Sequence, residues 1–373
     1  MKKFILSITL LLPILLFSQM HEGQKKILMV VSSYGKDKGS IRPGYEFDEF
    51  SQAYLIFKNN NLLIDVASPK GGKVEADKFN IDKPYNKIIL EDENALKLLE
   101  NTKATANVNA EDYNAIYIVG GKGAMFDLPY DPSLQDIILN LYQRENTVIS
   151  SVCHGPASFI HVKDNEKYII NGIELTSFCN IEEELFGKKW VKEFPFSLET
   201  KLKERGAIFE QTDFMLSKVV VSGKFVTGQN PFSTTKCAEE LVKSLGITPV
   251  DREFYSDEKS VNLIQELLDN VKTFEWAEKE IEKNKEKYDI PLIAAYGYYK
   301  IIASTESNEE LKKGIKLLEL TSSHFFNENL HLFLAETYAS TGKKTKAKKL
   351  LNELISKDLL KDKATKLLKE LEE

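Results

Sequence analysis

Residues Thr147–Pro156 read TVISSVCHGP, a β-branched apolar run that stops at a cysteine. Such a run up to Val152 is typical of a buried strand, and the Gly-Pro pair that follows ends it in a sharp turn into a helix. Cys153 would then project from the carboxyl end of the sheet, where the N–H groups that open the next helix favour a thiolate. An inert packed thiol is the alternative. We favour the reactive cysteine because His154 is a polar partner that an inert thiol does not need.

Apolar strands alternate with helices on both sides of this stretch. Because the strands are apolar on both faces, the pattern predicts an α/β fold with a mostly parallel sheet sandwiched by helices. The stretch from the Pro69–Gly72 turn to Ala95 is expected to be mostly irregular. The expected strands are Ile27–Ser33, Leu62–Ala67, Ala115–Val119, short strands within Tyr168–Phe178 and a hairpin over Val219–Val226, and the expected helices are Glu46–Asn60, Ala95–Leu99, Ser133–Tyr142, Gly155–His161, Ile181–Phe186 and Ser233–Leu245.

Length and composition set the broad class of the protein. The chain has 373 residues, of which 42% are hydrophobic and 28% charged, and its formal net charge is −6. The composition is that of a soluble globular protein, and the length predicts two domains or one large domain with an appendage. The mild acidity, without a basic stripe, argues against nucleic acid as a partner.

The first residues predict a secretory signal peptide over residues 1–18. Lys2 and Lys3 form a basic start, an apolar run follows, and Ser18 precedes the expected cleavage site at Gln19. The apolar run is short for a membrane span, although an uncleaved anchor is the alternative. The mature protein is therefore expected to be secreted or periplasmic.

The cysteines and histidines argue for one reactive thiol and against a metal site. Cys153, Cys179 and Cys237 are too few for a disulfide framework, and an odd count leaves at least one thiol unpaired. Cys179 could be a resolving thiol, although ordinary packing is favoured. The other histidines are scattered rather than placed at metal-ligand spacing, so no metal is expected; they are His21, His161, His324 and His331.

The C-terminal part differs in composition from the rest of the chain. Ile247–Ser260 is interpreted as a linker, and after it Lys, Glu and Leu recur at helical spacing. The predicted domains are therefore residues 19–250 and an all-α helical-hairpin region over 251–373. From Glu328 the spacing of small and apolar residues fits a tetratricopeptide-like hairpin, with a partial echo at Gly314. A plain helical bundle that caps the first domain or forms a dimer is the alternative.

Several separated motifs resemble the ThiJ/PfpI family, within the class I glutamine amidotransferase-like superfamily and specifically its glyoxalase III-like branch. The resemblance covers about Lys26 to Leu245 and implies a flavodoxin-like fold. The motifs are GYEFDEF (Gly44–Phe50), ASPKGG (Ala67–Gly72), NVNAEDYNAIYIVGGKGAMFDLP (Asn107–Pro129), SVCHGPA (Ser151–Ala157), LTSFCNIEEE (Leu175–Glu184) and VTGQNPFS (Val226–Ser233). The helical tail lies outside the usual family pattern.

The resemblance implies a Cys-His-Glu triad. Cys153 matches the nucleophile, His154 its neighbouring acid/base partner, and Glu183 the carboxylate that orients the imidazole, with Glu182 as a close competitor. An imidazole held by a carboxylate can move protons near neutral pH, which fits this assignment.

The resemblance also implies a second carboxyl group and an oxyanion hole. Glu49 matches the carboxyl group that hydrogen bonds the reactive sulfur and is favoured over Glu46; a buried, protonated acid could donate to a thiolate and later carry a proton. Gly120, Gly121 and the N–H of His154 would stabilise an oxyanion.

One departure from the branch lies beside the glycines. The position after them often holds His, and this chain has Lys122. This difference bears on substrate selection more than on the core chemistry.

The resemblance implies a cofactor-independent glyoxalase III-like lyase. Cys153 would attack methylglyoxal or a related α-oxoaldehyde to form a hemithioacetal, and Glu49 and His154 would move the protons that lead to a hydroxy acid. Family members are commonly homodimers. Two alternatives stay open: amide or peptide hydrolysis by the same triad, and a stress-related holdase or scaffold whose helical tail binds a protein partner.

Overall fold

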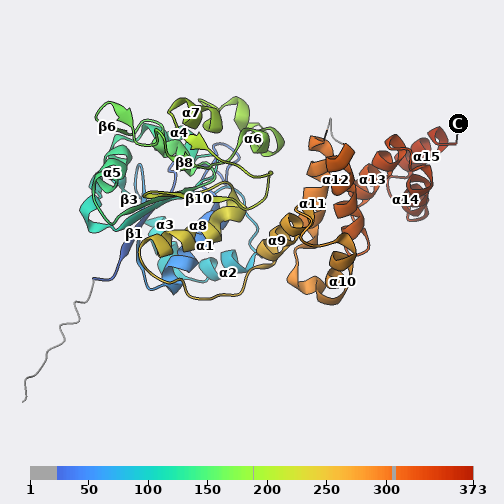
Figure 1. Cartoon of the computed structure of the whole chain (residues 1–373), viewed down its shortest axis with the longest axis horizontal. Helices are drawn as coiled ribbons and strands as arrows, with labels where there is room; N and C mark the ends of the chain where they lie inside the picture. The colour runs from blue at the N-terminus through green and yellow to red at the C-terminus, as the bar shows by residue number, and fades with distance from the viewer. Residues whose placement is uncertain (1–22, 188, 305–307, 373) are drawn as a thin grey trace, which may run out of the picture.

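The computed structural model describes residues 23–187, 189–304 and 308–372. Figure 1 shows a sheet covered by helices, which holds the first two thirds of these residues, and a helical region that extends from one side of it. The signal peptide predicted for residues 1–18 lies outside the described residues.

The central sheet has seven strands in the order β10-β11-β5-β4-β1-β2-β3. All neighbours are parallel except the edge hairpin β10–β11, which is antiparallel. The strands are β1 (Lys26–Val30), β2 (Leu63–Ser68), β3 (Lys103–Ala104), β4 (Ala115–Ile118), β5 (Val148–Val152), β10 (Val219–Ser222) and β11 (Phe225–Gly228). The predicted mostly parallel α/β sheet is confirmed.

Helices cover both faces of the sheet because alternate residues of each strand point to opposite sides. Ile27 and Met29 of β1 join one apolar core, and Leu28 and Val30 join the other. The helices are α1 (Phe47–Asn59), α2 (Pro84–Leu90), α3 (Glu93–Glu100), α4 (Ala124–Asp127), α5 (Pro132–Gln143), α6 (Asn180–Phe186), α7 (Leu198–Glu204) and α8 (Thr234–Ser244). The first core includes residues of α1, α3 and α8, and the second includes residues of α5 and α7.

Three local expectations need correction. Helix α2 lies in the stretch that was expected to be irregular, where Pro84 at its first turn fits a helix start. The segment interpreted as a linker up to Ser260 is shorter, because helix α9 already begins at Ser256, where Glu258 closes a capping box on Tyr255. The turn after β5 continues as one 3-10 helix, Gly155–Phe159, which is shorter than the expected helix.

The C-terminal region is helical throughout its described residues, as predicted. Its helices are α9 (Ser256–Leu268), α10 (Phe274–Asn284), α11 (Ile290–Ala303), α12 (Asn308–Ser322), α13 (Glu328–Ser340), α14 (Lys344–Ser356) and α15 (Lys361–Glu370). Helices α11 and α12 approach closely at Gly297 and Gly314, since a Cβ on Gly314 would lie 2.7 Å from the Ile301 side chain. Gly314 thus serves as the small packing residue that the sequence suggested. A tetratricopeptide-like repeat stays a prediction.

One apolar cluster joins the helical region to the sheet domain. Phe214 and Leu216, from the loop before β10, are buried together with Ile264 of α9 and Tyr296 of α11. The Tyr296 hydroxyl donates a hydrogen bond to Asp213 at 3.0 Å. At the first turn of α9, Tyr85 of α2 donates to Asp257 at 2.8 Å. The two parts of the chain are therefore packed together rather than only tethered.

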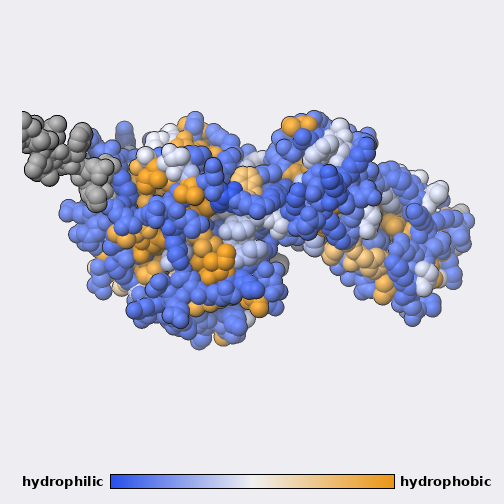
Figure 2. Space-filling model, turned by 90° about the horizontal axis from the view of Figure 1, so that it is seen from below, coloured by the Kyte–Doolittle hydropathy of each residue, from blue (hydrophilic) through white to orange (hydrophobic). Residues whose placement is uncertain are grey.

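Figure 2 shows a mostly hydrophilic surface over both parts, with scattered apolar groups. Within the described ranges, no helix has both the length and the apolarity that crossing a bilayer requires.

Candidate active site

Cys153 occupies a sharp elbow at the end of β5. Its φ is 58°, a left-handed conformation that costs a non-glycine residue free energy and is frequent at functional sites. Two backbone hydrogen bonds hold the elbow, since the Cys153 N–H donates to Gly228 and the Cys153 carbonyl accepts from Phe178, both at 2.9 Å. The conformation directs the sulfur out from the carboxyl end of the sheet, as the sequence predicted, while the side chain stays buried.

His154 links the thiol to a carboxyl group. The Cys153 Sγ lies 3.2 Å from His154 Nδ1, and His154 Nε2 lies 2.9 Å from Glu183 Oε1. The imidazole stacks on Phe178, with ring centroids 4.6 Å apart, and meets Phe194 edge-on. Both rings fix the imidazole orientation. The structure therefore brings together the three predicted triad residues, all of them buried.

Glu182, the competing acid, points to a different part of the site. Its carboxylate accepts hydrogen bonds from the Met215 N–H at 3.0 Å and from the Asn230 amide at 2.8 Å. It also accepts from the N–H of Cys179 at 3.2 Å. Burial raises the pKa of Glu182, and these hydrogen bonds oppose the rise. Glu182 thus joins α6 to the loops around β10 and β11, and Glu183 is the residue that reaches the imidazole.

Glu49 of α1 lies beside the reactive sulfur. Its Oε2 accepts a hydrogen bond from the Gly120 N–H at 2.7 Å, and its buried Oε1 has no nitrogen or oxygen partner among the described residues. A Cβ on Gly120 would lie 2.8 Å from both Glu49 Oε2 and the Cys153 Cβ, so the absence of a side chain lets these groups converge. Glu46 is the nearby alternative from the same motif, and it faces the cavity instead.

Burial sets the protonation of this pair. Desolvation raises the pKa of Glu49 well above its usual value, and the charge of Glu46 adds to the rise. Burial also raises the pKa of the Cys153 thiol, and a charged Glu49 raises it further, whereas the Gly121 N–H lowers it. A neutral Glu49 removes the repulsion and can donate to the sulfur, so protonation of the acid favours the thiolate.

The backbone amides around Cys153 differ from the expected oxyanion hole in one respect. The Gly120 N–H is already bonded to Glu49, so it is not free to bind an oxyanion, and we leave it out of the proposed hole. The Gly121 N–H faces the Cys153 sulfur. Gly121 has φ of 90°, and a Cβ there would lie 2.4 Å from the Glu46 nitrogen, so glycine is required. Gly121 and His154 remain as candidate donors.

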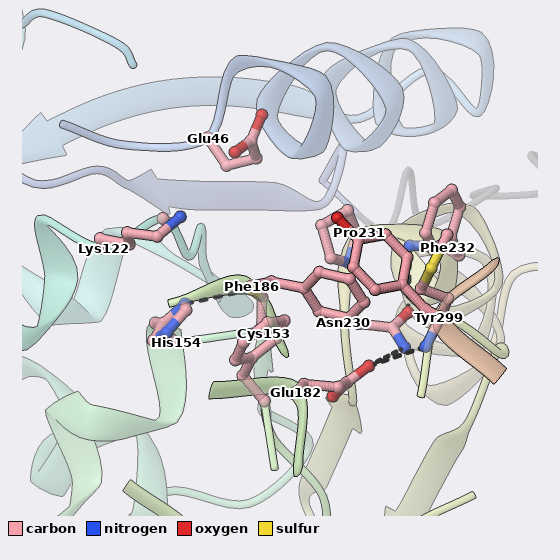
Figure 3. A pocket seen from close by; sticks show the side chains of 13 residues that line it. Glu46, Lys122, Cys153, His154, Glu182, Phe186, Asn230, Pro231, Phe232 and Tyr299 are labelled. Carbon is pink, nitrogen blue, oxygen red and sulfur yellow. Dashed lines mark hydrogen bonds between the residues drawn. The ribbon is translucent and has the colours of Figure 1, made fainter. Parts of the chain in front are cut away.

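A cavity of about 300 Å³ opens onto the sulfur. Cys153, His154, Gly121, Lys122 and Glu46 line it near the elbow. Its other walls are mostly apolar or aromatic, and Figure 3 shows Phe232 and Tyr299 on the side away from His154 and Lys122. These walls comprise Phe178, Glu182, Phe186, Met215, Asn230, Pro231, Phe232 and Tyr299.

Charged groups in this cavity face one another. Burial and the charge of Asp48 raise the pKa of Glu46 to about 8, while Lys122 lowers it. Glu46 is therefore mostly neutral at pH 7. Lys122 occupies the position where the resemblance led us to expect histidine, and it forms no salt bridge within the part of the chain that the structure describes.

Several residues that line the cavity were not predicted from the sequence. Asn230 and Phe232 belong to the matched VTGQNPFS motif, which could have indicated them. Tyr299 comes from α11, outside every matched motif, and nothing in the sequence placed it at the site. Cys179 and Cys237 are buried away from the cavity lining.

In residues 23–187, 189–304 and 308–372, no three His, Cys, Asp or Glu side chains are grouped so as to hold a metal ion. The expected absence of a metal and of a cofactor stays a prediction.

The fold and site define a class of α/β proteins with a flavodoxin-like sheet and a cysteine at a strand-to-helix elbow. Residues 25–244 match the DJ-1/PfpI family, and the chain belongs to this family. This match confirms the resemblance to the ThiJ/PfpI family that the motifs indicated. The helical region lies beyond the matched residues.

Among similar proteins is a glutathione-independent glyoxalase of Schizosaccharomyces pombe, 28% identical over 244 residues, which span 59% of this chain and 96% of that protein. Glyoxalase 3 of Candida albicans is 27% identical over 232 residues, with 58% and 97% covered.

Two solved structures are also similar to this chain. The crystal structure of glyoxalase III from Candida albicans is 26% identical with a TM-score of 0.54, covering 59% of this chain and 97% of that one. The Rapid Encystment Protein of Francisella tularensis is 34% identical with a TM-score of 0.56, covering 60% and 99%.

Proposed function

We propose that this protein is a glutathione-independent glyoxalase that converts methylglyoxal or a related α-oxoaldehyde to a 2-hydroxy acid. The observation that carries the proposal is the Cys153 elbow, with the thiol between the His154 imidazole and the buried Glu49. The relatives named as glyoxalases support the same reaction class. No glutathione, metal or nicotinamide takes part in the proposed chemistry.

The first step is attack of the Cys153 thiolate on the aldehyde carbon. A C–S bond forms, the carbonyl π electrons move to oxygen, and the resulting hemithioacetal oxygen is stabilised by the N–H groups of Gly121 and His154 and protonated from Glu49. A single donor of this kind is typically worth about 3 kcal/mol of transition-state stabilisation.

The second step moves hydrogen between the two carbons. A base removes the proton from the former aldehyde carbon, and protonation of the neighbouring carbon through an enediol turns the ketone into an alcohol. Glu49 and His154 are the groups placed to exchange these protons, with Glu183 holding the imidazole. The first carbon is then at the oxidation level of a thioester.

Water completes the reaction by attacking the thioester, which releases the hydroxy acid and returns the sulfur to Cys153. The sum is α-oxoaldehyde plus water giving 2-hydroxy acid, with one carbon oxidised and its neighbour reduced. This internal redox balance needs no external electron carrier. We propose that the enzyme belongs to the lyase class.

The test is lactate formation from methylglyoxal by the mature protein, from Gln19, without glutathione. We expect Cys153→Ala to abolish lactate formation, and unchanged turnover in this variant would overturn the proposal. Cys237→Ala is the matched control, because Cys237 is equally buried but packs under β5, where its sulfur lies 3.4 Å from the Ser150 hydroxyl.

Hydrolysis of an amide or peptide is the second candidate, since a Cys-His-Glu triad is also competent for acyl transfer. If lactate is absent while Cys153 still reacts with iodoacetamide, the thiolate serves another substrate, and peptide and amide screens decide. Export through the predicted signal peptide is part of the proposal and would be tested by fractionating the producing cells.

A scaffold role for the helical tail is the third candidate. The burial of Tyr296 and Ile264 against the sheet domain favours a tail that belongs to the enzyme. A protein partner for the outer helices would be sought by crosslinking the full-length protein.

A further inference from the structure

We propose that the helical region completes the substrate cavity and that Tyr299 of α11 makes the enzyme selective for α-oxoaldehydes with an aromatic substituent. The inference rests on the proposed function and adds a substrate class to it. It concerns a residue that lies outside the residues matched by the family.

The first observation is where Tyr299 lies. Tyr299 lies in α11 of the helical region and Cys153 follows β5 of the sheet domain, yet both residues line the same cavity. Figure 3 shows the Tyr299 ring beside Pro231 and Phe232, on the side of the cavity away from His154. The ring also meets Phe186 edge-on, with centroids 4.7 Å apart.

The second observation is that the structure holds this ring in place. Tyr296, one turn earlier in α11, is fully buried and stacks on Phe214 with ring centroids 5.1 Å apart. Lys300, the next residue after Tyr299, forms a salt bridge with Asp213 of the sheet domain. The contacts of Tyr296 and Lys300 thus fix how α11 faces the sheet domain. The Tyr299 ring is therefore a fixed part of the cavity wall rather than a surface side chain.

The third observation is the shape and character of the space. Methylglyoxal carries only a methyl group beyond its reacting carbonyls, whereas a cavity of about 300 Å³ reaches the lower end of the range for pockets that hold drug-sized ligands. With the aldehyde carbon at Cys153, the substituent would extend between Phe178 and the wall formed by Phe186, Phe232 and Tyr299. Aromatic rings on several sides favour a planar apolar group through edge and stacking contacts.

The charges in the cavity do not favour an anionic substituent. Lys122 and the carboxyl group of Glu46 both line it, and the Lys122 charge lowers the pKa of Glu46 and of Asp77, so the cation already interacts with two carboxyl groups. These groups lie on the Cys153 side, near the reacting carbonyls. The opposite wall presents mainly aromatic rings, together with the Asn230 amide and the Glu182 carboxyl group.

The experiment compares phenylglyoxal with methylglyoxal in the full-length protein. We expect the native protein to show a kcat/KM for phenylglyoxal at least about tenfold above that for methylglyoxal, because several rings contact the substituent. Tyr299→Ala should remove most of this preference by lowering kcat/KM for phenylglyoxal more than kcat/KM for methylglyoxal, and Tyr299→Phe should retain it. Ile302→Ala is the matched control, since Ile302 is in the same helix, is 40% exposed and does not line the cavity.

Three results would overturn the proposal: no preference in the native protein, an equal loss for both substrates in Tyr299→Ala, or faster turnover of 4-carboxyphenylglyoxal than of phenylglyoxal. The last would indicate charge recognition by Lys122 instead.

A second readout does not depend on turnover. Alkylation of Cys153 by N-phenyl iodoacetamide, relative to iodoacetamide, should slow in Tyr299→Ala and not in Ile302→Ala. If neither glyoxal is converted, the proposed function fails, while this ratio still decides whether Tyr299 forms an aromatic subsite. An unchanged ratio in Tyr299→Ala would overturn the inference.

Discussion

Two carboxyl groups at the start of α1 face the reacting centre with different roles: Glu49 in its first turn and Glu46 at its N-cap. Glu49 is fully buried beside the sulfur, and Glu46 lies one turn earlier, at the cavity wall. Burial raises the pKa of both groups, so neither is expected to carry a full charge at pH 7. One side chain is placed to exchange a proton with the substrate, and the other sets the polarity of the space where the substrate binds.

Glu49→Gln tests the proton-exchange role. The amide can still accept the hydrogen bond from the Gly120 N–H, but it cannot release a proton. We expect kcat for methylglyoxal to fall by about 10²- to 10⁴-fold, the usual contribution of a general acid or base, with KM little changed. Cys153 should still react with iodoacetamide. Steady-state kinetics measure the effect, and retention of more than about a tenth of kcat would contradict it.

Glu46→Gln tests the raised pKa through stability. The pKa of about 8 in the folded protein exceeds the ordinary glutamate value of 4.5. The unfolded chain therefore loses this proton at a lower pH than the native protein does, and Glu46 lowers the free energy of unfolding as pH rises from 4.5 toward 8. Glutamine removes this cost. We expect the variant to be more stable at pH 7 by up to about 3 kcal/mol, and to have unchanged stability at pH 4.

Urea unfolding at pH 4 and pH 7 measures this difference. Glu184→Gln is the control, because Glu184 is an exposed neighbour of the triad acid and should change stability by less than about 0.5 kcal/mol at both pH values. Equal stabilisation by Glu46→Gln at the two pH values would show that the pKa of Glu46 is not raised.

At the scale of elements, the site depends on two turns at the carboxyl ends of adjacent strands. β4 ends at the glycine pair and β5 ends at Cys153, and the strands are parallel neighbours with Ile118 opposite Ser151. The close packing of these turns leaves no room for a side chain at Gly120.

Gly120→Ala tests this packing. The new Cβ would lie 2.7 Å from the Val152 carbonyl oxygen and 2.8 Å from Glu49 Oε2, so the turns must separate. We expect a loss of about 1–3 kcal/mol in the free energy of unfolding, as for other overpacked sites, and a large loss of lactate formation. Gly23→Ala, where nothing lies within 4 Å of the added carbon, is the control and should leave both unchanged. Full activity in Gly120→Ala would contradict the arrangement.

The same elements explain how far the sequence predicted the structure. Buried parallel strands are apolar runs, so β4 and β5 were predicted almost to the residue, and β1 was predicted with its end three residues too late. Cys153 and His154 stood out because a Gly-Pro break follows a buried strand. Helix α2 was missed because it is short, and the competition between Glu182 and Glu183 was open because adjacent helical residues point in different directions, which only the packed α6 fixes.

At the scale of the whole molecule, the cavity wall beyond the family motifs was not predictable. Tyr299 reaches the site through the packing of α11 against Phe186 and Phe214, which depends on the tertiary arrangement of the two regions. Helical periodicity places Tyr299 on a face of α11 but does not say what that face contacts. The boundary near residue 250 and the homodimer implied by the family resemblance stay predictions.

The packing between the two regions predicts cooperative unfolding. Phe214 and Leu216 of the sheet domain share one apolar cluster with Ile264 and Ile293 of the helices, so neither region can expose its side of the cluster without cost. We expect differential scanning calorimetry of the full-length protein to show one transition. Two well-separated transitions in the native protein would show that the regions unfold independently.

Lys300→Met should weaken this coupling. The Lys300 side chain is 9% exposed and forms salt bridges with Asp213 and Glu310. Removing one partner of a buried ion pair typically costs about 3–5 kcal/mol, and because both carboxylates here are partly exposed we expect about 2 kcal/mol. The helical region should then melt at a lower temperature than the sheet domain and split the transition. Lys312→Met is the control, because it removes only an exposed ion pair with Glu309 at 3.9 Å, and it should leave a single transition. A single transition at an unchanged temperature in Lys300→Met would show that the apolar cluster alone holds the two regions together.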